Sequence, residues 1–147
     1  MKENPNHKNG RRLIVLAWNP GNASISKLHT CHYTFAFNVL GNKLNCHLTQ
    51  RSGDIALGIP FNLACYSLLT MMIAKECNYE LGEFSHTIID AHIYENHIPG
   101  LKEQLTRTPK KLPTIKIADK PFDELCFEDI TLENYVSDEI IKFDVAV

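Results

Sequence analysis

Cys31 and His32 are the first pair of residues in this chain that could do chemistry. A thiol beside an imidazole suggests the Cys–His pair of a cysteine protease. However, consecutive residues of an extended strand point to opposite faces, so these two side chains should not meet. Cys31 is therefore either a nucleophile activated by other groups or a small buried hydrophobic residue.

Arg51-Ser52-Gly53 offers a different chemistry, the binding of a small anion. A guanidinium, a hydroxyl and a backbone exposed by glycine together suit a phosphate group. An arginine near Cys31 would also lower the pKa of the thiol and increase its thiolate fraction. The alternative is a solvated turn. Asn62, a little further on, either contacts a ligand or caps the helix that follows it.

His92 and Tyr94 lie two residues apart in an expected strand, so they share a face and could contact one ligand hydroxyl. Asp90 shares that face. A histidine at position 86 could extend the group to a metal site. The spacing contains no H-x-x-x-H motif and no cysteine partner, so we expect no metal.

The elements that must position these residues follow from hydropathy patterns. The apolar run 13–18 predicts a buried strand. Alternating patterns in 33–39 and 44–48, on either side of Gly41-Asn42, predict an antiparallel hairpin. Segment 50–61 contains three breakers and predicts a loop that carries binding residues.

The rest of the chain predicts a helix over 63–76, buried on most sides, a strand over 84–94, a short helix over 98–105 and a strand over 114–117. Together these elements predict a single α+β domain over residues 1–147. In it, a mostly buried helix packs on a sheet.

Composition limits the function classes. The chain has 147 residues, 44% of them hydrophobic, and a net charge of −2, which excludes a strong basic field for nucleic acid or a membrane surface. The longest apolar run is too short and interrupted to cross a bilayer. Five cysteines without a C-x-x-C pair, and no secretory signal, predict free thiols and a cytoplasmic location. We expect Cys46, Cys65 and Cys77 to be packing residues.

These features occur together in a pattern that resembles the thymidylate synthase family, which also includes the phage pyrimidine hydroxymethylases. The resemblance covers essentially the whole chain and corresponds to the C-terminal, nucleotide-binding half of the family. Its most specific part is the block Q-R-S-x-D-x-x-L-G-x-P-F-N. The matching segments are Arg11-Arg12, Ala17-Trp18-Asn19, Cys31-His32, Gln50 to Asp54, Leu57 to Asn62, Asp90 to Tyr94, Arg107-Thr108-Pro109 and Asp144 to Val147.

The resemblance implies a reaction. The Cys31 thiolate would add to C6 of the uracil ring of dUMP, which makes C5 nucleophilic. The co-substrate 5,10-methylenetetrahydrofolate would supply the one-carbon unit and a hydride, giving dTMP. No metal is implied.

The resemblance also implies a role for each matching side chain. Arg51 and Ser52 would hold the phosphate, with Arg11 and Arg12 reaching it from the other subunit of a homodimer. Asn62 would read the uracil edge, and His32 would belong to the polar network near it. The remaining implied contacts are His92 and Tyr94 with the ribose 3′-hydroxyl, Asp54 with nucleotide and folate, Leu57, Gly58 and Phe61 with folate, and Val147 in closing the site against water.

Three departures from the family pattern stand out. Thr30 replaces the proline that usually precedes the nucleophile, and Ile89 replaces a glycine. The N-terminal half of the fold, which supplies a further phosphate arginine and a catalytic glutamate, is expected to be absent, so activity would require it from elsewhere. A pyrimidine hydroxymethylase and an incomplete nucleotide-binding remnant are the alternatives. Asn62 favours uracil over cytosine, because a cytosine site should use an acidic residue there.

Overall fold

The computed structural model of the chain describes residues 12–145. The chain forms two compact units, Met1–His92 and Ile93–Val147. The secondary structure is mixed, with one long helix, one short helix and six strands among the described residues. The predicted α+β class is confirmed, whereas the single domain stays a prediction.

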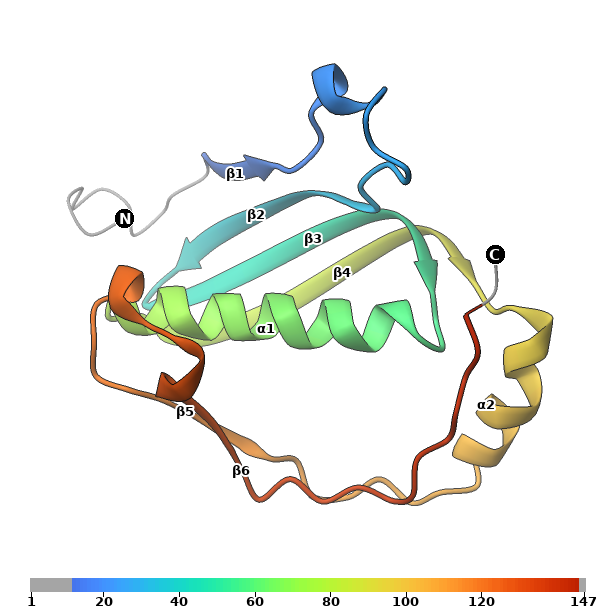
Figure 1. Cartoon of the computed structure of the whole chain (residues 1–147). Helices are drawn as coiled ribbons and strands as arrows, with labels where there is room; N and C mark the ends of the chain where they lie inside the picture. Colours follow the sequence, from blue (N-terminus) through green and yellow to red (C-terminus); the bar gives the residue numbers. More distant parts are fainter. Residues whose placement is uncertain (1–11, 146–147) are drawn as a thin grey trace. The chain divides into compact units, whose positions relative to one another are not determined.

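The first unit contains a four-stranded sheet in the order β1-β2-β3-β4. Its strands are β1 (Leu13–Leu16), β2 (His32–Leu40), β3 (Lys43–Asp54) and β4 (Glu80–His92). Strands β1, β2 and β3 pair antiparallel, whereas β3 and β4 pair parallel. Parallel strands need a crossover, and helix α1 (Gly58–Glu76) supplies it while lying along one face of the sheet (Figure 1).

The predicted hairpin is confirmed as β2 and β3. Leu40 pairs with Lys43, so the turn consists of Gly41 and Asn42 alone. Gly41 has φ +63°, a conformation that glycine adopts without the steric cost of a Cβ atom.

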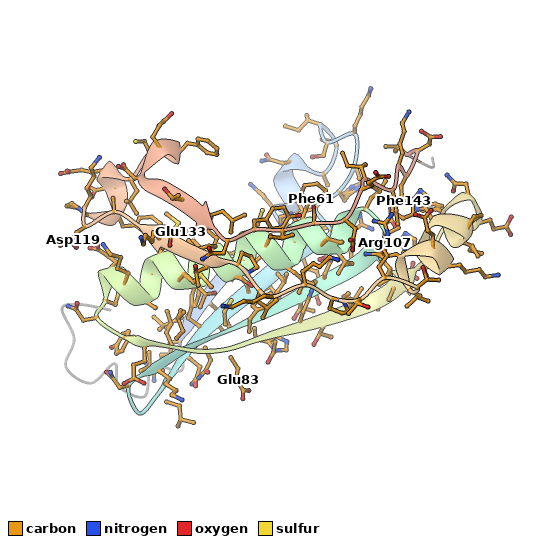
Figure 2. All side chains as sticks on the ribbon, turned by 90° about the horizontal axis from the view of Figure 1, so that it is seen from below. Phe61, Glu83, Arg107, Asp119, Glu133 and Phe143 are labelled. Atoms are coloured by element: carbon orange, nitrogen blue, oxygen red, sulfur yellow. The ribbon has the colours of Figure 1, made fainter. Side chains whose placement is uncertain are left out.

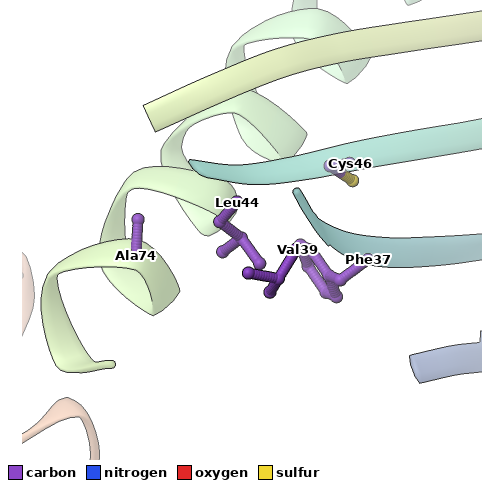
Figure 3. Close-up of a cluster of buried hydrophobic side chains, with 5 residues drawn as sticks. All are labelled: Phe37, Val39, Leu44, Cys46 and Ala74. Atoms are coloured by element: carbon purple, nitrogen blue, oxygen red, sulfur yellow. The ribbon is translucent and has the colours of Figure 1, made fainter. Parts of the chain in front are cut away.

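The core lies between this hairpin and α1. Alternate residues of the two strands face the helix, and Phe37, Val39, Leu44 and Cys46 pack with Ala74 (Figure 3). Burial raises the pKa of the Cys46 thiol, which keeps the residue neutral. The packing role predicted for Cys46 is therefore confirmed.

Two burial predictions need correction. Strand β1 exists, but Leu16 is 73% exposed, because β1 is the edge strand of the sheet and, within the described residues, pairs with β2 alone. Helix α1 buries one stripe, at positions 59, 66, 70 and 74, rather than most of its surface. Phe61 on its other side is 70% exposed (Figure 2), and Cys65 is exposed as well, so the packing role predicted for Cys65 is wrong.

The loop predicted over 50–61 is wrong at both ends, because strand β3 covers 50–54 and helix α1 begins at Gly58, which leaves 55–57 as the connection. Strand β3 runs on to Asp54 because β4 pairs with it throughout, with Asp54 opposite His92. Gly53 is not a breaker here. A Cβ atom at Gly53 would lie 2.5 Å from Cδ1 of Ile59, so the missing side chain lets α1 approach the strand.

The outer face of the sheet carries no part of α1, and Glu83 of β4 points away from the helix (Figure 2). Strand β4 ends at His92, where its partner β3 also ends. Tyr94 therefore lies beyond the strand, contrary to the prediction for 84–94.

The second unit contains helix α2 (Ile98–Gln104) and an antiparallel pair of strands, β5 (Thr114–Ile117) and β6 (Ile130–Glu133). Short 3₁₀ turns occur at Glu95–His97, Phe122–Glu124 and Phe127–Asp129. The predicted helix and the β5 strand are confirmed, whereas β6 was not predicted. Within residues 12–145, no helix is both long and apolar enough to cross a membrane.

Candidate functional site

Cys31 lies immediately before β2 and is partly exposed. Its Sγ is 3.9 Å from the carbonyl oxygen of His29, a weak contact. The next side chain is engaged elsewhere, because Nδ1 of His32 lies 2.7 Å from the hydroxyl of Tyr66 on α1. The thiol is thus accessible to a ligand, and His32 is held by the helix.

Arg51 grips the segment that carries Cys31. Its backbone N–H donates to the carbonyl of Cys31 at 2.8 Å. Its guanidinium donates to the carbonyls of Thr30, from Nε at 3.2 Å, and of His29, from Nη2 at 2.6 Å. These two side-chain bonds use two of the five N–H donors of the guanidinium. Arg51 is therefore a strand residue beside the thiol segment, and the solvated-turn interpretation is wrong.

Gln50, the preceding residue of β3, is 3% exposed and organises the other side of the site. Its Nε2 donates to the carbonyl of Ser52 at 2.9 Å and to Oδ1 of Asn62 at 3.1 Å. Its Oε1 lies 3.0 Å from Nε2 of His86 and can only accept, so His86 carries the proton on Nε2. Burial, and then the nearby His47, lower the pKa of His86 and favour its neutral form.

The side chain of Asn62 bonds to the Gln50 amide and does not cap the helix. Helix α1 begins at Gly58 and its N-cap position is Leu57, so Asn62 lies in the second turn. The capping interpretation of Asn62 is therefore wrong. Its side-chain oxygen faces Gln50, and this bond fixes the orientation of the amide.

Sequence reasoning missed Gln50, His86 and Tyr66 as residues that build the site. One signal was available for Gln50. It continues the buried alternation of Leu44, Cys46 and Leu48 along β3, so a polar side chain at that position must find buried partners.

The connection between β3 and α1 carries the residues that resemblance assigns to folate. Asp54 accepts from the backbone N–H of Ala56 at 2.9 Å, which tightens the turn into the helix. Leu57 and Gly58 follow at once, and the ring of Phe61 is largely exposed. This connection presents both apolar surface and a carboxylate.

His92 lies at the same end of β3, opposite Asp54. Its carbonyl accepts from the backbone N–H of Ile55 at 3.0 Å, and its Nδ1 is 3.3 Å from the carbonyl of Asp90. The Asp90 carboxylate is farther, at 3.9 Å from Nδ1. Among residues 12–145, no three His, Cys, Asp or Glu side chains gather as a metal site would require.

The other predicted residues are placed as follows. Ser52 pairs with Asp90 across the parallel strands, and Arg12 is exposed just ahead of β1. Tyr94 belongs to the second unit, where its ring lies edge-on to that of His97 with centroids 5.6 Å apart. Arg11 and Val147 lie outside the described residues. All five cysteines are free, as predicted, and Cys77 is partly buried at the end of α1.

Comparison with known proteins gives a consistent result. The family model described as thymidylate synthase matches residues 1–147. The thymidylate synthase of Listeria monocytogenes serotype 4a (strain HCC23) is 51% identical over 149 residues, which cover 100% of this chain and 46% of the relative. That of Haloferax volcanii is 40% identical over 196 residues, which cover 99% of this chain and 56% of the relative. The chain spans about half the length of the curated relatives it matches.

Proposed function

The chain belongs to the thymidylate synthase family, and we propose that it supplies the nucleophile and the dUMP-binding surface for the reductive methylation of dUMP to dTMP. One observation carries the proposal. Two consecutive residues of β3 join both parts of the site, since Arg51 holds the segment ending in Cys31 and Gln50 holds Asn62. A nucleotide bound there would meet a thiol, a cation and an oriented amide together.

The reacting atom of the chain is Sγ of Cys31. Its thiolate adds to C6 of the uracil ring, which develops negative charge at C5 and O4. The Arg51 guanidinium, in the strand beside the Cys31 segment, is the cation that receives the phosphate of the nucleotide. Bound 5,10-methylenetetrahydrofolate supplies the one-carbon unit to C5 and the hydride that completes the methyl group. C5 loses its proton and the Cys31 thiolate leaves C6, which restores the free enzyme and gives dTMP.

Asn62 provides the discrimination between bases. Its Oδ1 accepts from uracil N3–H and its Nδ2 donates to O4, whereas cytosine presents an acceptor and a donor at these positions. The bond from Gln50 to Oδ1 holds the amide in one orientation. Oδ1 has a second lone pair for the base, so the bond to Gln50 does not block it.

The remaining roles complete the proposed site. Phe61 and Leu57, exposed or partly exposed on the β3–α1 connection, suit the aromatic part of a folate, and Asp54 lies beside them. His92 and Tyr94 bind the ribose, Ser52 supports the phosphate and His32 stays in the polar network. Arg11 and Arg12 act across a homodimer, Val147 helps close the site, and the enzyme works in the cytoplasm.

The test is covalent capture of the nucleotide. The chain is mixed with the complementary half of the Listeria monocytogenes relative, 5-fluoro-dUMP and 5,10-methylenetetrahydrofolate, and the intact mass is measured. The expected result is an adduct that Cys31→Ala abolishes and that the exposed control Cys65→Ala retains. Absence of an adduct, although the complementary half is bound, would favour a non-catalytic remnant. Product analysis for dTMP against 5-hydroxymethyl-dUMP separates methylation from hydroxymethylation.

A further inference from the structure

The rings of Trp18 and His29 stack, with centroids 5.4 Å apart and planes inclined by 16°. They come from different segments, one just after β1 and the other two residues before Cys31. Trp18 lies on an anchored stretch. The N–H of Ala17 donates to the carbonyl of Tyr33 at 2.9 Å, and Asn19 accepts from the N–H of Gly21 at 3.0 Å.

The backbone of His29 faces the catalytic groups. Its carbonyl oxygen accepts from Nη2 of Arg51 at 2.6 Å and lies 3.9 Å from Sγ of Cys31. His29 thus contacts both the Trp18 ring and the Arg51 guanidinium, and it lies in the segment that carries Cys31. Loss of the stack would act on all of these at once.

The segment that leads into Cys31 needs such a restraint. Between the 3₁₀ turn Pro20–Asn22 and the start of β2, the chain consists of turns and irregular backbone. Irregular backbone keeps conformational freedom unless contacts remove it, and that freedom would spread the positions of the thiol. An aromatic pair stabilises one arrangement beyond the area it buries.

We propose that the Trp18–His29 stack positions Cys31 against Arg51, which makes His29 a positioning residue for the nucleophile. The catalytic meaning of this role rests on the proposed function. The role itself is a property of the free chain. With the stack intact, the carbonyls of His29 and Thr30 stay on the guanidinium, so the segment that carries the thiol keeps one position against the strand of Arg51.

Alkylation of Cys31 by iodoacetamide tests the proposal without nucleotide. Peptide mass spectrometry separates Cys31 from the other cysteines. His29→Ala should slow alkylation of Cys31 about two- to tenfold, the range that corresponds to the usual strength of an aromatic pair. His29→Phe keeps a ring and should restore the parent rate. Ile25→Ala, an 80% exposed position on the same connection, is the matched control and should leave the rate unchanged.

Trp18 is the only tryptophan of the chain, so its fluorescence reports the stack directly. The emission should change in His29→Ala and in His29→Leu, and return toward the parent spectrum in His29→Phe. Because the stack acts as a unit, the double variant Trp18→Leu/His29→Ala should alkylate no more slowly than the slower single variant.

Three results would overturn the proposal: an unchanged or faster rate in His29→Ala with an unchanged far-UV spectrum, equal rates in His29→Phe and His29→Leu, or additive losses in the double variant. If His29→Ala does not fold, the comparison of His29→Phe with His29→Leu decides. A missing 5-fluoro-dUMP adduct would refute the proposed function but would leave these rates as they are, so the two failures are distinguishable.

Discussion

Gln50→Leu is the substitution whose effect the structure predicts most directly. The side chain is 3% exposed and takes part in hydrogen bonds to Ser52, Asn62 and His86. A net contribution of about 1 kcal/mol for each bond gives a loss of about 3 kcal/mol, increased by the partners left unsatisfied. Burial of the added leucine surface offsets about 1 kcal/mol. The expected fall in the free energy of unfolding is therefore about 2–4 kcal/mol.

Urea denaturation followed by circular dichroism measures this loss. Gln104→Leu, at an exposed position of α2, is the matched control and should change the free energy of unfolding by less than about 0.5 kcal/mol. Adding His86→Phe to Gln50→Leu removes an unsatisfied donor, so the double variant should be about 1 kcal/mol more stable than the sum of the single losses implies. Equal losses for Gln50→Leu and Gln104→Leu would refute the network.

The other predictions concern pH, packing and binding. The pKa of His86 is lowered from 6.5 in the folded state, so the unfolded chain binds the proton more readily. The contribution of His86 to stability should therefore be constant above pH 6.5 and be lost as the pH falls through the lowered value. In His86→Gln, which keeps an N–H donor, the melting temperature should depend less on pH between pH 5 and 8. Gly53→Ala should lower the free energy of unfolding in urea by about 1–3 kcal/mol, because the new Cβ would lie 2.5 Å from Ile59. Gly58→Ala, where the nearest atom is 3.8 Å away, should not lower it, and equal losses in the two variants would contradict this packing. Arg51→Lys loses the planar guanidinium that donates to two carbonyls. Calorimetry on the variant mixed with the complementary half should show dUMP binding weakened about ten- to hundredfold. Unchanged binding would exclude Arg51 as a phosphate ligand.

Local patterns in the sequence determined the hairpin, the long helix and the chemical groups of the site. The alternation on both sides of Gly41-Asn42 and the helical spacing after Leu63 are properties of neighbouring residues. The elements that these patterns predicted are β2, β3 and α1. The thiol, the guanidinium and the amide were also identifiable as types, because their chemistry depends on the residue itself.

Tertiary structure alone decided how these groups meet. Gly53 reads locally as a breaker, yet pairing with a strand more than thirty residues later keeps it extended, and a helix packs into the space its side chain would fill. Gln50 likewise bonds to Asn62 and His86, 12 and 36 positions later, and Trp18 stacks on His29 across an intervening turn. Such contacts depend on the assembly of the whole sheet, because a polar group or a ring has no preferred partner until the folded chain brings one within reach.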